Sequence, residues 1–365
     1  MSLLELQLEV LDVSGTGVRY LPWLSGLSRL QELNLSRTCI NDLHFLSAIT
    51  SLRDLDCSFA GSTLTDISPL SSLVSLERLS LVGTPVRDIS PLTHQSNLKE
   101  LSLPILVDDL TPISTLTRLT FLDISYSKVT QLGPVATLAN LRSLDCSFTM
   151  VSDLMPLSSL KGLQDVHLTD TEVTALDPLA SLLELQLLDC SSTSVKDLSP
   201  IAGLNQLLNL DISYSRVSDL SHLSGLVRLS CLRCDNIHVT DLTPLSSLMA
   251  LRILGLSSCS RLADISPLRG LTNLERLNCN TSKIHDLTPL SGLTKLVSVG
   301  CSSTNVVDLS PLSALSGLQT LEFNATRVSD VSPLACLRGL TSLGCSSTGV
   351  LDLSPLLALT GLRID

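Results

Sequence analysis

The feature that most constrains the fold is a unit of about 22 residues that recurs along nearly the whole chain. Segments such as Asp66-Ile-Ser-Pro-Leu70, Asp197-Leu-Ser-Pro-Ile201 and Asp308-Leu-Ser-Pro-Leu312 mark it. Counting by the proline position, which holds Phe45 and His222 in two units, gives sixteen repeats. Eleven of the fifteen intervals are 22 residues, and the others are 21, 23, 23 and 24. Because so short a unit cannot bury an apolar face by itself, the repeats must stack on one another.

Each unit combines two hydrophobic periods. Alternation at Leu144 and Cys146 predicts a short strand with both side chains pointing inward, and the following Pro156-Leu-x-x-Leu160 has helical spacing. A Ser or Thr before the proline, as in Ser199-Pro200, predicts a side-chain N-cap. Because 22 residues leave no room for a full helix, we expect one 3₁₀ or helical turn. The sequence therefore predicts an α/β repeat solenoid with a parallel concave β-sheet and short turns on the convex side, as a single domain over residues 1–365.

These motifs resemble the leucine-rich repeat family. The 22-residue unit with Asp-[Leu/Ile]-[Ser/Thr]-Pro-Leu is similar to the subclass of bacterial internalins and eukaryotic protein-phosphatase regulatory subunits. The position that usually holds asparagine is mostly Thr or Ser here, as at Thr149 and Thr193, so we expect a hydroxyl ladder in place of the asparagine ladder. The cysteine content is similar to that of leucine-rich repeat proteins from trypanosomes and related protists.

Composition narrows the function. With 44% hydrophobic and 2% aromatic residues, the core must consist of small aliphatic side chains. The mean hydropathy is +0.38, yet no run approaches the roughly 18 apolar residues of a membrane-spanning helix, so we expect no membrane insertion. A net charge of −11 argues against nucleic acid as a partner. The motifs H-E-x-x-H, G-x-S-x-G and the P-loop are absent from the sequence, so we expect no catalytic residues, no cofactor and no enzymatic activity.

Aspartate fills the third position before the proline in thirteen of the sixteen repeats. These residues are Asp42, Asp66, Asp88, Asp109, Asp153, Asp197, Asp219, Asp241, Asp264, Asp286, Asp308, Asp330 and Asp352. They could form a cation-binding stripe, but the favoured interpretation is that each carboxylate caps backbone N–H groups where the chain enters the convex turn. Because they account for thirteen of 35 acidic residues, the net charge by itself says little about the partner.

Seven of the eleven cysteines occupy the inward strand position, namely Cys57, Cys146, Cys190, Cys234, Cys279, Cys301 and Cys345. In repeats 7 to 13 they alternate with Leu168, Ile212 and Leu256, which is typical of packing, since buried cysteine behaves as a small hydrophobe. Cys231-x-x-Cys234 followed by His238 resembles a zinc half-site, but alternation places Cys231 outward and Cys234 inward, so we expect no metal site. So many free thiols indicate a reducing compartment, and we expect an intracellular, cytoplasmic protein.

The outward strand residues are free to bind a partner. The candidate partner-binding residues are Phe121, Asp123, Tyr126, Asp145, Phe148, Asp165, His167, Asp170, Asp189, Asp211, Tyr214 and Arg233. Aromatic residues are common anchors of binding hot spots, and an acidic column steers a basic partner. Alternatively, the aspartates pair with serine hydroxyls and the aromatics cover the strand edge. Stacked like charges are unfavourable, so we expect that scaffold needs alone do not explain them. The nearly bare strands at 298–303 and 342–347 are not expected to hold a hot spot.

The first and last repeats show no polar cap, so we expect either a fragment of a longer protein or ends covered by oligomerisation or another domain. The main functional prediction is a non-enzymatic scaffold that binds a protein, basic in character, on its concave face. Two alternatives stay open. One is a targeting module of a larger enzyme such as a ligase, kinase or cyclase. The other is an enzyme inhibitor or regulator, because acidic, cysteine-rich repeats resemble ribonuclease inhibitor.

Overall fold

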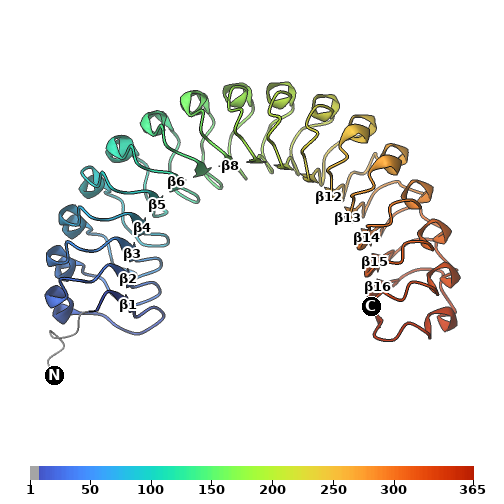
Figure 1. Ribbon diagram of the computed structural model, residues 1–365, viewed down its shortest axis with the longest axis horizontal. Coiled ribbons are helices and arrows are strands. Elements are labelled where there is room, and N and C mark those ends of the chain that lie inside the picture. The colour runs from blue at the N-terminus through green and yellow to red at the C-terminus, as the bar shows by residue number, and fades with distance from the viewer. Residues whose placement is uncertain (1–7) are drawn as a thin grey trace. The chain divides into compact units, whose positions relative to one another are not determined.

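The computed structural model describes residues 8–365 and divides the chain into two compact units, Met1–Val173 and Thr174–Asp365. Each unit is a stack of repeats, with strands on its inner side and 3₁₀ turns on its outer side (Figure 1). Residues 1–7 lie outside the described residues. The expectation of a single domain over residues 1–365 and that of an uncapped amino-terminal end both include these residues, so both stay predictions.

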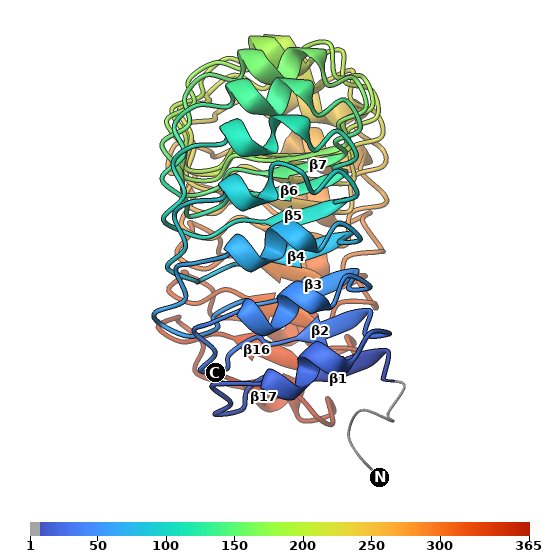
Figure 2. The same cartoon turned by 90° about the vertical axis from the view of Figure 1, so that its left-hand side faces the viewer.

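The first unit holds eight short strands, each paired in parallel with the next, so that Leu33 of β2 lies in register with Leu11 of β1 and Leu55 of β3. The strands are β1 Val10–Asp12, β2 Glu32–Asn34, β3 Asp54–Asp56, β4 Arg78–Ser80, β5 Glu100–Ser102, β6 Phe121–Asp123, β7 Ser143–Asp145 and β8 Asp165–His167. The 3₁₀ turns between them, seen from the side in Figure 2, are η2 Pro22–Gly26, η3 His44–Ala48, η4 Ser68–Ser72, η5 Ser90–Leu92, η6 Thr111–Thr115, η7 Gly133–Thr137 and η8 Met155–Ser159.

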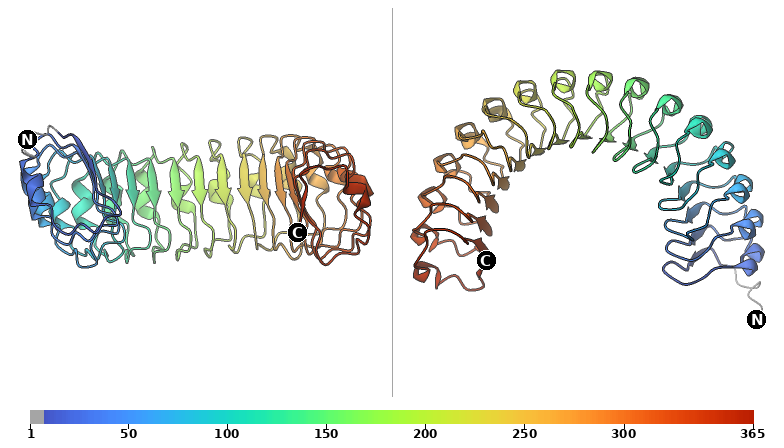
Figure 3. Two further views of the ribbon diagram at one scale, coloured as in Figure 1. Left: turned by 90° about the horizontal axis from the view of Figure 1, so that it is seen from below. Right: turned by 180° about the vertical axis from the view of Figure 1, so that it is seen from behind.

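The second unit repeats this plan with nine parallel strands, which line its inner face in Figure 3. They are β9 Leu187–Asp189, β10 Asn209–Asp211, β11 Cys231–Arg233, β12 Ile253–Gly255, β13 Arg276–Asn278, β14 Ser298–Gly300, β15 Thr320–Glu322, β16 Ser342–Gly344 and β17 Arg363–Ile364. Its 3₁₀ turns are η9 Asp177–Leu179, η10 Ser199–Ile201, η11 Ser221–Leu223, η12 Thr243–Ser247, η13 Ser266–Gly270, η14 Thr288–Leu290, η15 Ser310–Leu312, η16 Ser332–Leu334 and η17 Ser354–Leu356. The predicted solenoid of parallel strands and short turns is confirmed.

The predicted N-cap of the convex turn is wrong. In η10 the N-cap position is held by Leu198, which makes no side-chain cap bond, and Ser199 is already the first residue of the turn. The Ser199 hydroxyl instead donates to Asp197 Oδ2 at 2.9 Å. The serine therefore positions the aspartate, and the aspartate holds the backbone.

The capping role of the thirteen aspartates is confirmed. In each of these repeats the backbone N–H two residues later donates to aspartate Oδ1, at 2.7–2.8 Å. The hydrogen bonds from Ser68 and Ser199 hold the pKa of Asp66 and Asp197 below the ordinary aspartate value. These carboxylates satisfy backbone donors of the 3₁₀ turn that have no partner within the turn.

The inward strand positions form the core. Leu144 and Cys146 are both fully buried, as predicted from the alternation. The alternating series Cys146, Leu168, Cys190, Ile212, Cys234, Leu256 and Cys279 is fully buried throughout, whereas Cys345 is partly exposed. Burial raises the pKa of the Cys146 and Cys190 thiols, which keeps them protonated and unreactive.

The hydroxyl ladder differs from the expectation. Thr149 Oγ1 donates to the carbonyl of Cys146 and Thr193 Oγ1 to that of Cys190, each at 2.6 Å. These bonds close a turn within one repeat, because the short threonine side chain reaches a carbonyl only three residues back.

A second turn with a left-handed residue follows most of the strands in both units. Over residues 8–365, thirteen non-glycine residues have positive φ, among them Tyr126 at 60° and Phe148 at 58°. We call the third residue of each three-residue strand the inner column. In eight repeats an Asp or Asn of the inner column accepts the backbone N–H two residues later, as Asp145 accepts that of Ser147 at 2.8 Å. This bond holds the chain as it enters the left-handed residue.

In the second unit the cap also comes from the preceding repeat. Where the inner column is glycine, Asp235, Asn280 and Asn324 accept the N–H of Ser257, Ser302 and Ser346, respectively, 22 residues later at 2.6–2.7 Å. Where it is Arg233 or Glu322, the cap is a serine hydroxyl: Ser213 Oγ accepts the N–H of Asp235, and Ser302 Oγ accepts that of Asn324. Where the preceding repeat supplies the cap, the inner-column residue does not have to be Asp or Asn.

The Asp235 side chain lies over Gly255. A Cβ at Gly255 would stand 2.9 Å from Asp235 Oδ2. We therefore expect Gly255→Ala to displace the cap of Ser257 and to lower the free energy of unfolding by about 1–3 kcal/mol, measured by urea denaturation. The matched control is Gly292→Ala, whose Cβ would meet nothing within 4 Å. Equal stability of the two variants would contradict the cross-repeat cap.

Candidate functional site

Three neighbouring strands of the first unit bring together the predicted residues of repeats 6 to 8. In the inner column, Asp123 of β6 lies in register with Asp145 of β7, which lies in register with His167 of β8. Two residues toward the strand start, at the first residue of each strand, Phe121 and Asp165 flank Ser143. The predicted clustering of these outward residues is therefore present within the first unit.

The aromatic residues at the end of these strands form a stacked pair. The rings of Tyr126 and Phe148 are 4.4 Å apart between centroids and 8° from parallel. Their backbone N–H groups donate to the carbonyls of Ser147 and Thr169 in the next repeat, at 2.9 and 2.7 Å. Tyr126 is 59% exposed and Phe148 42%. The pair is a rigid apolar surface open to solvent, and Asp170 occupies the same turn position one repeat on, with φ 53°.

The aspartates of β6 and β7 carry a structural task that sequence reasoning missed. Asp123 Oδ1 accepts the N–H of Ser125 at 2.9 Å, just as Asp145 caps Ser147. The cap explains why an oxygen acceptor stands at each of these positions, and the expectation that scaffold needs alone do not explain the stacked charges stays a prediction. The asparagines at equivalent positions, Asn34 and Asn278, make the same bond without a charge. The cap requires an oxygen acceptor, and the negative charge is additional to it.

The charge of this column is only partly balanced. Burial raises the pKa of Asp123 above its ordinary value, and the charge of Asp145 raises it further, against the hydrogen bonds from Ser125. Among the described residues, neither carboxylate forms an ion pair with an arginine or lysine. A partly buried acidic pair of this kind favours a cation brought by a partner.

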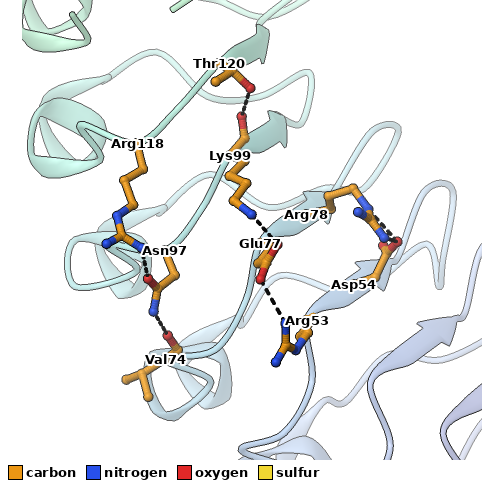
Figure 4. A network of polar contacts seen from close by, with 9 residues as sticks. All are labelled: Arg53, Asp54, Val74, Glu77, Arg78, Asn97, Lys99, Arg118 and Thr120. Carbon is orange, nitrogen blue, oxygen red and sulfur yellow. Dashed lines mark hydrogen bonds and ion pairs between the residues drawn. The ribbon is translucent and has the colours of Figure 1, made fainter. Parts of the chain in front are cut away.

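Two acidic residues near the start of the first unit, Glu77 and Asp54, form ion pairs with cationic side chains. Figure 4 shows Glu77 between two cations: Lys99 Nζ lies 2.6 Å from Oε2 and Arg53 Nη1 lies 3.2 Å from Oε1. Beside them, Arg78 binds Asp54 at 2.7 Å. These contacts compensate the charges of Glu77 and Asp54. Asp123 and Asp145, which are neighbours in the inner column, have no such ion pair among the described residues.

The second unit carries the remaining predicted residues. Asp211 of β10 lies in register with Asp189 of β9 and Arg233 of β11. Arg233 Nη1 is 3.9 Å from Asp211 Oδ2, a loose ion pair, and burial together with Asp189 raises the pKa of Asp211. Tyr214 is 59% exposed at the left-handed turn after β10. Asp189 and Asp211 form an acidic pair of their own, bounded by an arginine.

The suspected zinc half-site differs in one respect from the sequence analysis. Cys234 is fully buried as expected, but Cys231 is also buried, at 8% exposure, although its strand position is outward. Burial raises the pKa of both thiols. No group of three metal-ligating side chains occurs in residues 8–365. Over the same range, no helix has the length and apolar character needed to cross a bilayer.

The comparisons with known proteins agree with this architecture. A family model for leucine-rich repeats (two copies) matches residues 250–292. The internalin InlF of Listeria monocytogenes is 30% identical, with a TM-score of 0.76 over 80% of this chain and 88% of that chain. A leucine-rich repeat protein of Leptospira interrogans is 20% identical over 97% and 95% of the two chains, with a TM-score of 0.75, which shows the shared fold alone. None of the curated proteins compared with the sequence matches it.

The functional domain of InlJ from Listeria monocytogenes is similar as well, at 25% identity and a TM-score of 0.76 over 93% of this chain and 73% of that chain. Its structure is described as including a cysteine ladder. The cysteine content of this chain therefore does not set it apart from the internalin type of repeat.

The cap and the charge of Asp123 can be separated by substitution. Asp123→Asn keeps the acceptor for Ser125 and removes a partly buried charge, so we expect the unfolding free energy at pH 7 to be unchanged or higher. Asp123→Ala loses the cap and should cost about 1 kcal/mol. Because the folded pKa of Asp123 is raised, protonation stabilises the wild type as the pH falls toward about 4. Any advantage of Asp123→Asn should therefore shrink in urea titrations across that range, and an advantage that grows would contradict the raised pKa.

Proposed function

Because this chain belongs to the leucine-rich repeat family, we propose that it is a non-enzymatic binding scaffold that holds a basic protein segment against its acidic inner strands. Repeat solenoids use their extended concave faces in this way, since the outward strand positions are free of core packing. The observation that carries the proposal is the exposed Tyr126–Phe148 stack beside Asp123 and Asp145, whose charges have no cationic partner in the described residues.

The chemistry of this patch favours arginine or lysine side chains. A guanidinium can lie over an aromatic face and donate to a neighbouring carboxylate at the same time. Burying the negative charge of Asp123 next to that of Asp145 is unfavourable because no positive charge compensates them. A cation that approaches the two carboxylates lowers this electrostatic cost. The backbone bonds of the left-handed turns hold the aromatic pair in place, so little conformational entropy is lost on binding.

The second unit offers the same combination in Asp189, Asp211 and Tyr214. Arg233, next in register to Asp211, would repel a basic side chain and so marks where a basic segment ends. Each acidic pair is a separate element of the proposal and is tested by its own variant.

The test is a pull-down from a lysate of the source organism, followed by affinity measurement on the captured protein. We expect Asp123→Asn/Asp145→Asn to weaken binding about tenfold, with a smaller effect at high salt. The matched control is Asp66→Asn/Asp88→Asn, which removes two charges from the convex turns of the same unit and keeps both caps. Asp189→Asn/Asp211→Asn tests the second unit in the same way.

Equal binding by the inner-strand and convex-turn variants would contradict the proposal. The alternatives have their own readouts in this experiment. A targeting module would capture the substrate of an attached catalytic domain, and an inhibitor would capture an enzyme whose activity falls on addition of the chain.

A further inference from the structure

The inner face of the second unit contains a hollow of about 260 Å³ over strands β11 to β15. One of the two nearly bare strands on which no hot spot was expected, that at 298–303, contributes Ser298 and Gly300 to this hollow. The residues that matter for its chemistry are Arg233, Gly255, Arg276, Asn278, Gly300 and Glu322. We call this surface the glycine-floored hollow.

The hollow follows from the order of residues in the inner column. From β11 to β15 this column reads Arg233, Gly255, Asn278, Gly300 and Glu322, each in register with the next. Glycine strands alternate with strands that carry long polar side chains. The glycines are tolerated because Asp235 and Asn280 cap the turns from the preceding repeat and occupy the space over Gly255 and Gly300. The depression is thus part of the scaffold's own hydrogen bonding.

The charges around the hollow are free to bind. Arg276 is exposed and makes no ion pair or hydrogen bond to a carboxylate within the described residues. Arg233 is 54% exposed in its side chain and reaches Asp211 only at 3.9 Å. Glu322, at the other end, receives a long contact of 3.5 Å from Asn280 Nδ2. The hollow therefore has the guanidinium group of Arg233 at one end, that of Arg276 in its middle and the carboxylate of Glu322 at the other end, while the lining carboxylate of Asp235 is held by the N–H of Ser257.

The spacing of these charges defines an occupant. Arg233, Arg276 and Glu322 lie on β11, β13 and β15, so successive charges are two strand spacings, about 10 Å, apart in the direction across the strands, with Arg276 at the first residue of its strand rather than in the inner column. An extended peptide advances about 3.3 Å per residue, so about three residues span that distance. We propose that the glycine-floored hollow binds an extended acidic peptide segment that crosses the strands, with two acidic residues three apart and a basic residue three further on. Glu322 and Asp235 disfavour a continuous polyanion such as RNA.

This site is separate from Asp123 and Asp145 and borders the acidic pair of the second unit only through the Arg233–Asp211 contact, and its proposed ligand is acidic rather than basic. The probe is the fluorescein-labelled peptide Gly-Asp-Gly-Ser-Asp-Gly-Ser-Lys-Gly, titrated with the full chain by fluorescence anisotropy. We expect binding at least tenfold tighter than for the charge-reversed peptide, in which each Asp is Lys and the Lys is Asp. Arg276→Glu should weaken binding of the probe about tenfold, and a probe with its second Asp changed to Lys should recover most of that loss.

Arg261→Glu is the matched control, because Arg261 is an exposed arginine of the same unit that does not line the hollow. It should leave binding of the probe unchanged, as should Asp123→Asn/Asp145→Asn, which separates this test from that of the proposed function. Circular dichroism and Arg276→Gln show whether a loss comes from misfolding. The proposal is overturned if neither peptide binds, if both bind alike, or if an oligouridylate binds more tightly than the probe and loses affinity on Arg276→Gln.

Discussion

Side-chain capping of backbone N–H groups at the two corners of most repeats is the interaction on which this solenoid depends. A strand of three residues and a 3₁₀ turn leave several donors without partners in regular structure, and an unpaired buried donor costs about as much as a lost hydrogen bond. On the convex side the cap is an aspartate such as Asp197, two residues before the N–H that it holds. On the concave side it is an inner-column residue such as Asp145, which precedes the left-handed turn.

This division of labour changes how the acidity of the chain relates to function. The convex aspartates are exposed and hydrogen-bonded to their own turns, so they offer a partner little that is specific. The inner-column aspartates have the same bond but are partly buried beside one another, and Asp123 and Asp211 consequently have raised pKa values. The proposed binding of a basic segment rests on the second group, because a cation there would relieve an existing electrostatic cost.

The sequence predicted those features that follow from periodicity. Leu144 and Cys146 are buried because alternation on a strand allows no other placement. The aspartate that accepts the convex cap bond was predicted, but the role of the serine was not, because residue type does not show that Ser199 lies inside the 3₁₀ turn. The left-handed backbone at Tyr126 and Phe148 has no signal in residues that rarely adopt it, so neither their stacking nor the inner-column cap was predictable. The buried thiols serve packing whatever the redox state of the compartment, so the cytoplasmic location stays a prediction.

The position of the residue that accepts the cap bond also explains how the same kind of repeat can carry surfaces of opposite charge. While the inner column supplies the cap, it is restricted to Asp or Asn, and runs of aspartate accumulate charge, as at Asp189 and Asp211. Once the preceding repeat supplies the cap, as Ser213 and Asp235 do, the inner column can become arginine, glutamate or glycine. Arg233, Gly255, Gly300 and Glu322 all stand where this transfer has occurred. The hollow and the acidic strands are therefore two results of a single hydrogen-bonding rule, and variation in the binding face requires no change in the core.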